Sequence, residues 1–436
     1  MLRFGAAYST AGDHQQALDE VLPRVLGDLD GPPDLVVCFM SMHHADVAAG
    51  IALGLSERTG TSNLIGCTGQ GVIGEGRELE DGPALSLWAA RLPGVEVRPF
   101  GLEVHALTEG QLAIAGWPAG EEDEQATALM LADPFSFPAD AFLERLNDQA
   151  PGMTVLGGFA SGGTVAGRHR LLHGIDVLDE GAVGVVLTGP VDIRPVVSQG
   201  CRPIGRPFVV TRGEGNLVHE LAGRPAVDRL KELLEELGPR DEALLRLGGL
   251  QVGQVLDEHK ADFERGDFLI RQLAGADPDT GTIAVGDSVE LGSTLQFHLR
   301  DAEAADEELA EMLGPVARWK PKGVLLFSCN GRGERFFGSS DHDAAMVRDA
   351  TGGAPTAGFF AQGELGPVGG RNFVHAYTAS LAVFCEPGDP VPAEPAVTVA
   401  EEPLVIEAGD LLTGPVIDPA IDPGPPEEPP KEPEPA

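Results

Sequence analysis

Apolar residues along the chain group into two kinds of segment, and these predict a mixture of strands and helices. Short apolar runs of strand length occur at residues 35–40, 63–67, 84–90, 183–187, 282–285, 294–299 and 324–327. Apolar residues at helical spacing, or small residues that suit a helix, occur at residues 13–29, 45–55, 226–237, 306–313 and 343–349. This mixture predicts an α/β fold of two lobes, with mixed β-sheets flanked by helices.

Three glycine-containing segments resemble one another. They lie at residues 65–71, 156–163 and 357–364. Each has a glycine directly after an apolar entry, then small or polar residues, then another glycine. Related halves of the chain would produce this pattern, and so would chance in a sequence with 58 glycines. The resemblance alone therefore does not establish a duplication.

The composition changes sharply after residue 385. Residues 386–436 are dominated by proline and acidic residues, and Lys431 is their one basic residue. Such a segment buries too little apolar surface to offset the entropy of ordering, so we expect a disordered acidic tail. A short apolar patch at residues 403–406 is either incidental or a docking motif.

Charge and cysteine usage exclude several classes of function. The formal net charge is −38, which disfavours binding to nucleic-acid phosphates or to anionic membranes. No apolar run approaches the roughly 20 residues of a membrane span, so we expect no membrane insertion. The five cysteines are scattered and form no CxxC pair, which indicates a reducing, cytoplasmic environment.

The sequence lacks the common catalytic and metal-binding motifs. It has no GxSxG, HExxH or GxxxxGK[ST] pattern, and its glycine segments do not match GxGxxG. We therefore assign no catalytic residue and no metal ligand, and we expect a protein that is not an enzyme.

Polar residues follow the apolar strand at residues 324–327. Ser328, Cys329, Asn330 and Arg332 come directly after it. Polar groups at the end of a buried strand often face a ligand cleft in α/β proteins, and neighbouring glycines allow close backbone approach. The alternative is a tight connection in which Arg332 pairs with a nearby acid.

Cys329 and His375 allow a nucleophilic alternative. A cation such as Arg332 stabilises a thiolate and lowers the pKa of the thiol. His375 lies in a segment, residues 371–378, whose alternation predicts a single strand with Phe373 and His375 on one face. A buried, hydrogen-bonded histidine is the other reading of this position.

Several of these motifs together resemble the FIST sensory domain family. The C-terminal resemblance rests on residues 327–333 (FSCNGRG), 337–338, 358–367 (GFFAQGELGP) and 375–378. Further resemblance lies at residues 65–68, 181–185, 199–205 and 220–226, so it runs from about residue 3 to 385. Val72 stands where the family often carries glutamate, so no role is carried over to the first glycine loop.

The resemblance implies an intracellular sensor of small ligands with a FIST N-terminal lobe at residues 1–220 and a FIST C-terminal lobe at residues 221–385. Amino acids have been proposed as ligands for the family, and members are often linked to signalling proteins. This chain carries no recognisable output domain, so we expect signal transduction through a separate partner protein. Some family members bind haem as nitric oxide sensors, which makes a haem-binding gas sensor a second hypothesis, and an enzyme using Cys329 is a third.

The expected ligand-binding residues are polar or glycine residues near predicted strand ends. Arg332 would bind a carboxylate in a bidentate manner, and Glu364 would receive an ammonium group or orient Arg332. The whole predicted site comprises Cys329, Asn330, Arg332, Gly358, Gly363, Glu364, Asn372 and His375.

Overall fold

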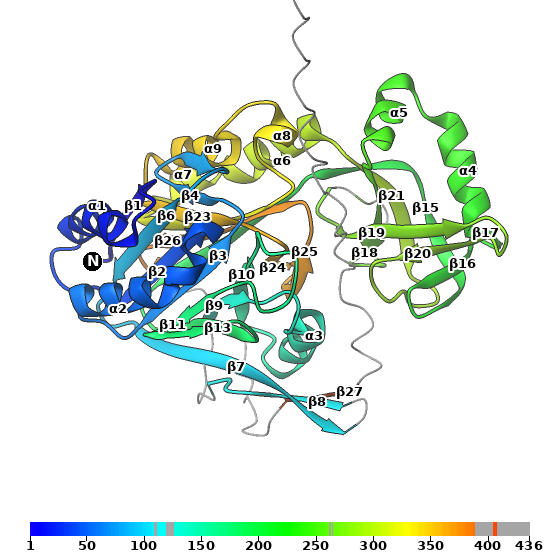
Figure 1. The fold of residues 1–436 in the computed structure, drawn as a ribbon. Helices are drawn as coiled ribbons and strands as arrows, with labels where there is room; N and C mark the ends of the chain where they lie inside the picture. Colours follow the sequence, from blue (N-terminus) through cyan, green and yellow to red (C-terminus); the bar gives the residue numbers. More distant parts are fainter. Residues whose placement is uncertain (109–110, 119–125, 261–262, 264, 389–403, 408–436) are drawn as a thin grey trace, which may run out of the picture.

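The computed structural model describes residues 1–108, 111–118, 126–260, 263, 265–388 and 404–407. These residues form an α/β body and a smaller β-barrel beside it, at the right of Figure 1. The predicted α/β class with mixed sheets and flanking helices is confirmed. None of the described helices is both long and apolar enough to cross a membrane.

The body contains three units that share one order of sheet strands, and the first and third also have a helix between the first two of these strands. The first unit consists of β1 (Arg3–Ser9), α1 (His14–Gly27), β2 (Leu35–Ser41), η1 (Met42–Val47), α2 (Ala48–Thr59), β3 (Leu64–Gly69), β4 (Val72–Gly74), β5 (Arg77–Leu79) and β6 (Leu85–Arg91). Its sheet has the order β1-β6-β2-β3, in which only β2 and β3 are parallel. Asp13 caps α1, because its side chain accepts a hydrogen bond from Gln16 N.

The second and third units repeat this topology with different insertions. The second has β7 (Glu96–Thr108), β8 (Gln111–Ala115), β9 (Thr127–Ala132), α3 (Ala139–Gln149), β10 (Thr154–Phe159), β11 (Leu171–His173), β12 (Asp176–Leu178) and β13 (Ala182–Thr188). The third has β14 (Asp192–Gln199), α6 (Ala302–Leu313), α7 (Val316–Trp319), β22 (Gly323–Cys329), α8 (Glu334–Phe337), α9 (His342–Thr351), β23 (Thr356–Ala361), β24 (Glu364–Val368), β25 (Arg371–His375) and β26 (Thr378–Cys385). Their sheets run β7-β13-β9-β10 and β14-β26-β22-β23, which is the order of the first unit.

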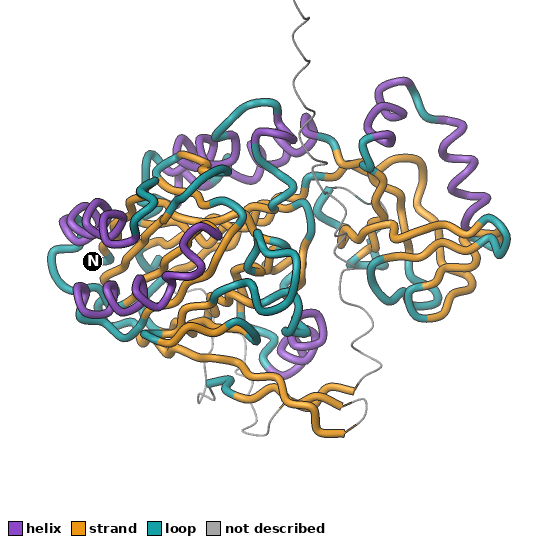
Figure 2. Tube along the Cα trace, viewed as in Figure 1, coloured by secondary structure: helices purple, strands orange, loops and turns teal. Residues whose placement is uncertain are grey.

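Each unit gives a hairpin to the sheet of another unit, and the exchange is cyclic. The hairpin β4–β5 extends the third sheet at β23, β11–β12 extends the first at β3, and β24–β25 extends the second at β10. The three sheets therefore enclose one shared core, in which Phe39, Phe327 and Phe359 pack together. Figure 2 shows the body's helices around the outside of these sheets.

The threefold arrangement explains the three similar glycine segments. Gly66, Gly157 and Gly358 occupy equivalent places in β3, β10 and β23. A Cβ there would lie 2.1, 1.8 and 1.9 Å from the carbonyl oxygen of the paired residue on the neighbouring parallel strand. Only glycine fits such an approach. The pattern thus reflects three related units rather than two halves, and it arises from sheet packing.

The barrel interrupts the third unit between β14 and α6. It contains β15 (Cys201–Glu214), β16 (Leu217–Leu221), β17 (Arg224–Pro225), α4 (Ala226–Glu236), α5 (Pro239–Arg246), β18 (Leu250–Val255), β19 (Phe268–Asp277), β20 (Thr282–Val285) and β21 (Thr294–Arg300). Strand β15 pairs with both β21 and β16, which closes the sheet. The sheets thus divide the chain into two parts. The body comprises residues 1–199 and 302–385, and the barrel comprises residues 201–301. The expected boundary between the two lobes was residue 220.

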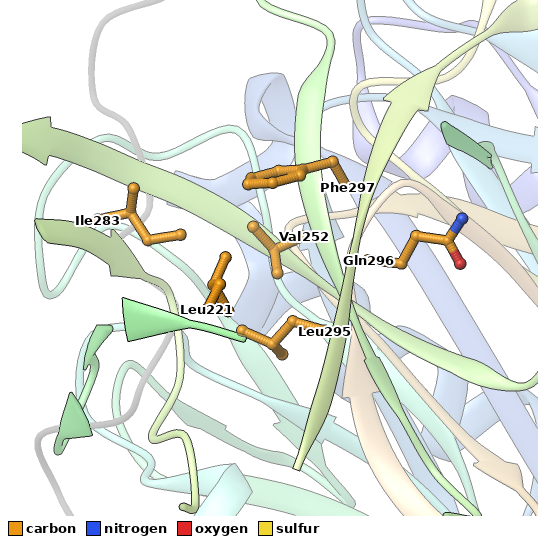
Figure 3. A pocket seen from close by; sticks show the side chains of 6 residues that line it. All are labelled: Leu221, Val252, Ile283, Leu295, Gln296 and Phe297. Carbon is orange, nitrogen blue, oxygen red and sulfur yellow. The ribbon is translucent and has the colours of Figure 1, made fainter. Parts of the chain in front are cut away.

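The interior of the barrel is apolar and tightly filled. Figure 3 shows the side chains of four strands that surround a small gap in this interior. It is lined by Leu221, Val252, Ile283, Leu295, Gln296 and Phe297. It has no room for a water molecule. Its five apolar lining residues belong to the hydrophobic core of the barrel, so we treat it as a packing gap.

The structure differs from one local expectation and describes little of the expected tail. Residues 371–378 do not form one strand, because Tyr377 adopts a left-handed conformation (φ 63°) and turns the chain from β25 into β26. The expected disordered tail lies outside the described residues, apart from β27 (Leu404–Glu407), which pairs with β8. This strand contains most of the apolar patch that we noted in the tail.

Candidate functional site

The polar segment after β22 lies where the third unit meets the barrel. Arg332 is 2 % exposed, and its guanidinium holds Asp343 at the start of α9 through Nε to Oδ2 (2.6 Å) and Nη2 to Oδ1 (2.9 Å). Its Nη1 donates to the carbonyl of Tyr377 at 3.3 Å. An acid of the same chain therefore occupies the fork of Arg332, which is not left open for a ligand carboxylate. This arrangement matches the alternative of a tight connection in which Arg332 pairs with a nearby acid.

Asp343 completes a satisfied ionic network. Burial alone would raise the pKa of its carboxyl, but Arg332, His342 and Ser328 outweigh burial and hold the pKa well below its usual range. Ser328 Oγ donates to Oδ2 at 2.8 Å, and His342 Nδ1 lies 3.0 Å from Oδ1. We call Ser328, Arg332, His342 and Asp343 the Arg332 network.

The hairpin donated by the first unit borders this network. Glu78 accepts a hydrogen bond from Ala344 N at 3.0 Å, and its own N–H donates to Asp341. Burial and the nearby charge of Asp343 raise the pKa of Glu78 to about 7. The loop after Arg332 is thus fixed by a second unit of the body.

A second group of polar residues lies near the end of β22, on the side that faces the barrel. Not all of its buried polar atoms have a hydrogen-bond partner among the described residues. Glu364, at the start of β24, is fully buried, and its Oε2 accepts a hydrogen bond from Thr378 N at 3.1 Å. Its Oε1 has no hydrogen-bond partner among the described residues. The thiol of Cys329 faces the carboxyl without making a conventional hydrogen bond to Oε1. Burial raises the pKa of Glu364 well above its usual range.

The barrel contributes Arg300 and Gln251 to this group. The guanidinium of Arg300 lies 4.7 Å from the ring of Tyr377, donates to the carbonyl of Gly331, and leaves its buried Nε without a partner among the described residues. The side chain of Gln251 reaches the Tyr377 hydroxyl, whereas its buried Oε1 has no hydrogen-bond partner within the described part of the chain. We call Gln251, Arg300, Cys329, Glu364 and Tyr377 the junction cluster.

The chemistry of Cys329 does not favour a nucleophile. Burial and the neighbouring Glu364 raise the pKa of its thiol to about 12, although Arg300 opposes the rise. Burial lowers the pKa of His375 to about 4, and its Nε2 already lies 3.0 Å from the carbonyl oxygen of Gly366. The buried, hydrogen-bonded histidine is therefore the reading that the structure supports, and Cys329 forms a wall of the cluster.

The other predicted residues serve mainly to hold the fold. Gly358 lies in the middle of β23, where its lack of a side chain permits sheet pairing. Asn372 bonds Asn147 of α3, Met153 O and Val155 N. Gly363 accepts a hydrogen bond from Phe159 N at 2.9 Å. Of the eight predicted residues, the structure thus brings together Cys329, Asn330, Arg332 and Glu364. His375 lies opposite Glu364 in the ladder of β24 and β25, and Gly363 directly precedes Glu364 in the chain.

Sequence reasoning missed Asp343, Tyr377 and the barrel residues. A buried arginine demands an acid, and Asp343 follows eleven residues after Arg332, which is a signal that the sequence does carry. Arg300 and Gln251 come from an inserted domain whose position the sequence pattern does not reveal. Among the described residues, no group of three or more His, Cys, Asp and Glu side chains is arranged to hold a metal ion.

Comparison with known proteins assigns the chain to a family. Residues 34–224 match the FIST N domain and residues 226–367 match the FIST C domain, so the chain belongs to the FIST family. It is 44 % identical to an uncharacterized protein of Mycobacterium tuberculosis, over 88 % of this chain and 100 % of that relative. It is 42 % identical to an uncharacterized protein of Mycobacterium bovis, over 88 % of this chain and 99 % of that relative. FIST domains are associated with the sensing of small ligands.

Proposed function

We propose that this protein is a cytoplasmic, non-enzymatic sensor that binds a small zwitterion such as an amino acid at the junction cluster. Glu364 receives the ammonium group, and Arg300 replaces Arg332 as the residue that binds the carboxylate. Tyr377 and Cys329 flank the ligand. The five cysteines are free and buried, which fits a reducing compartment.

One observation carries this proposal. Three buried polar atoms that lack a partner among the described residues gather in the junction cluster, namely Glu364 Oε1, Gln251 Oε1 and Arg300 Nε. Buried polar atoms in folded proteins are nearly always hydrogen-bonded, so such a concentration is typical of a binding site. Tyr377 adds backbone strain at the same place, because a positive φ is costly for an aromatic residue.

The arrangement also gives the proposed ligand a way to produce a signal. The barrel connects to the body through only two chain crossings, at residues 199–201 and 300–302. Because the junction cluster is buried between the two parts, a ligand enters when the barrel moves away from the body. A ligand that bonds Glu364 on the body and Arg300 on the barrel favours one arrangement of the two parts. A separate partner protein then reads this arrangement.

A thermal-shift screen against the twenty amino acids tests the proposal. We expect at least one amino acid to raise the melting temperature of the parent, since a ligand at 100 times its Kd stabilises a protein by about 2.7 kcal/mol. Glu364→Gln should remove this shift. Glu78→Gln is the matched control, because it also neutralises a buried carboxyl of raised pKa but lies outside the junction cluster. A parent without any shift, or equal shifts in parent and Glu364→Gln, would refute the proposal.

A further inference from the structure

Strand β8 projects from the body and pairs with only part of β7. The first half of β7 pairs with β13, whereas its second half, from Glu103 to Thr108, pairs with β8. On its other side β8 pairs with β27, four residues of the tail that start at Leu404. Figure 1 shows β27 lying beside β8 at the bottom of the molecule. The tail strand is therefore the outermost strand of an eight-stranded sheet.

Without the tail, β8 would be a strong acceptor for another strand. Its sequence is Gln-Leu-Ala-Ile-Ala, with no lysine and no proline to discourage pairing. Ile114 is 1 % exposed and belongs to the core that packs around α3. Its neighbour Ala113 is 7 % exposed. Such an edge offers both unpaired backbone groups and an apolar surface to an extended peptide.

The geometry points to a second binding surface: we infer that β8 accepts an extended apolar segment by strand addition, and that β27 of the same chain is its resident occupant. The register places Leu404 opposite Ile114 and Ile406 opposite Leu112, in an antiparallel ladder. The tail thus acts as a removable strap over a peptide-binding edge.

The strap is suited to exchange because it is short. A four-residue ladder gains few backbone hydrogen bonds, and their net contribution is of the same order as the entropic cost of ordering the residues. A competing partner would therefore present an extended apolar segment of its own to the edge of β8.

The test uses the full chain with the strap released by two prolines. Val405→Pro/Ile406→Pro removes two backbone donors from β27. Val416→Pro/Ile417→Pro is the matched control, because it changes the same dipeptide elsewhere in the tail. We measure amide hydrogen exchange of residues 111–115 and the fluorescence polarisation of a labelled peptide of residues 401–410. This surface lies outside the junction cluster, so its test is independent of the proposed amino-acid site.

We expect exchange at residues 111–115 to be at least tenfold faster in the released variant than in the parent and the control. The peptide should bind the released variant at least tenfold more tightly than either of them. Equal exchange in the parent and the released variant would overturn the inference, as would failure of the peptide to bind the released variant. Protection of β8 that rises with protein concentration would also overturn it, because the occupant would then be the tail of a second copy.

Discussion

The Arg332 network and the junction cluster lie at the same strand ends but differ in how completely their polar groups are paired. In the network, both fork nitrogens of Arg332 and both oxygens of Asp343 are hydrogen-bonded. In the cluster, Glu364 is equally buried but keeps one oxygen unpartnered among the described residues. A paired buried charge holds elements in place, whereas a buried polar atom without a hydrogen-bond partner costs stability. The comparison separates an anchor of the fold from a candidate binding site.

Removing the anchor should have the largest effect on stability. Arg332→Met leaves Asp343 buried without its main partner, so we expect a loss of about 3–5 kcal/mol in the free energy of unfolding. Urea denaturation at pH 7 measures the loss. Arg371→Met is the control, because its partner Asp148 is exposed and such surface pairs contribute about 1 kcal/mol or less. Similar losses in both variants would contradict the distinction between anchor and surface pair.

Gly358→Ala should produce the next largest effect, although Gly358 was predicted as a ligand-binding residue. The added Cβ meets the Leu326 carbonyl oxygen at 1.9 Å, and overpacking of this kind costs about 3 kcal/mol. Gly353→Ala is not a suitable control, because Gly353 has a positive φ. Gly275→Ala is a suitable control, because a Cβ on Gly275 would meet no atom within 4 Å and the residue does not adopt a positive φ. Chemical denaturation of both variants should show a large loss for the first and a small change for the second.

These two residues show what the sequence predicted and what it did not. The apolar patterns predicted a minority of the strands of the body and about half of its helices. Helix α1 was predicted because burial on one side leaves a periodic pattern, and β22 because burial on both faces leaves a continuous apolar run. The three similar glycine segments left open whether the chain contains related units, because the number of units and the exchange of hairpins depend on long-range pairing. The segment at Arg332 was correctly singled out, yet its charge partner and the barrel side of the junction come from packing between distant segments.

The ionisation of the Glu78 carboxyl should make the stability of the protein depend on pH. Its pKa is raised from 4.5 to about 7, so its contribution to stability is fully present below pH 4.5 and is lost as the pH rises through 7. Glu78→Gln cannot ionise, and we therefore expect it to be more stable than the parent by about 3 kcal/mol at pH 8 and nearly equal to it at pH 4.5. Unfolding measured at both pH values checks this, and a difference that does not vary with pH would show that ionisation of Glu78 is not the cause.

The smallest expected effect concerns thiol chemistry in the junction cluster. The pKa values of Cys329 and Cys201 are raised to about 12 by burial, so neither thiol should react with a maleimide in the folded protein at pH 7.5 within an hour. Both should react after denaturation in urea. Mass spectrometry of the labelled peptides measures this, and rapid labelling of Cys329 in the folded protein would restore the enzyme hypothesis.

Calorimetric titration of the amino acid with the largest thermal shift tests the central claim most directly. The account predicts saturable binding to the parent and to Glu78→Gln, and binding at least tenfold weaker to both Glu364→Gln and Arg300→Met. Because Glu364 lies on the body and Arg300 on the barrel, loss of binding in both variants would place the ligand between the two parts. Unchanged affinity in both variants would contradict the junction cluster as the binding site.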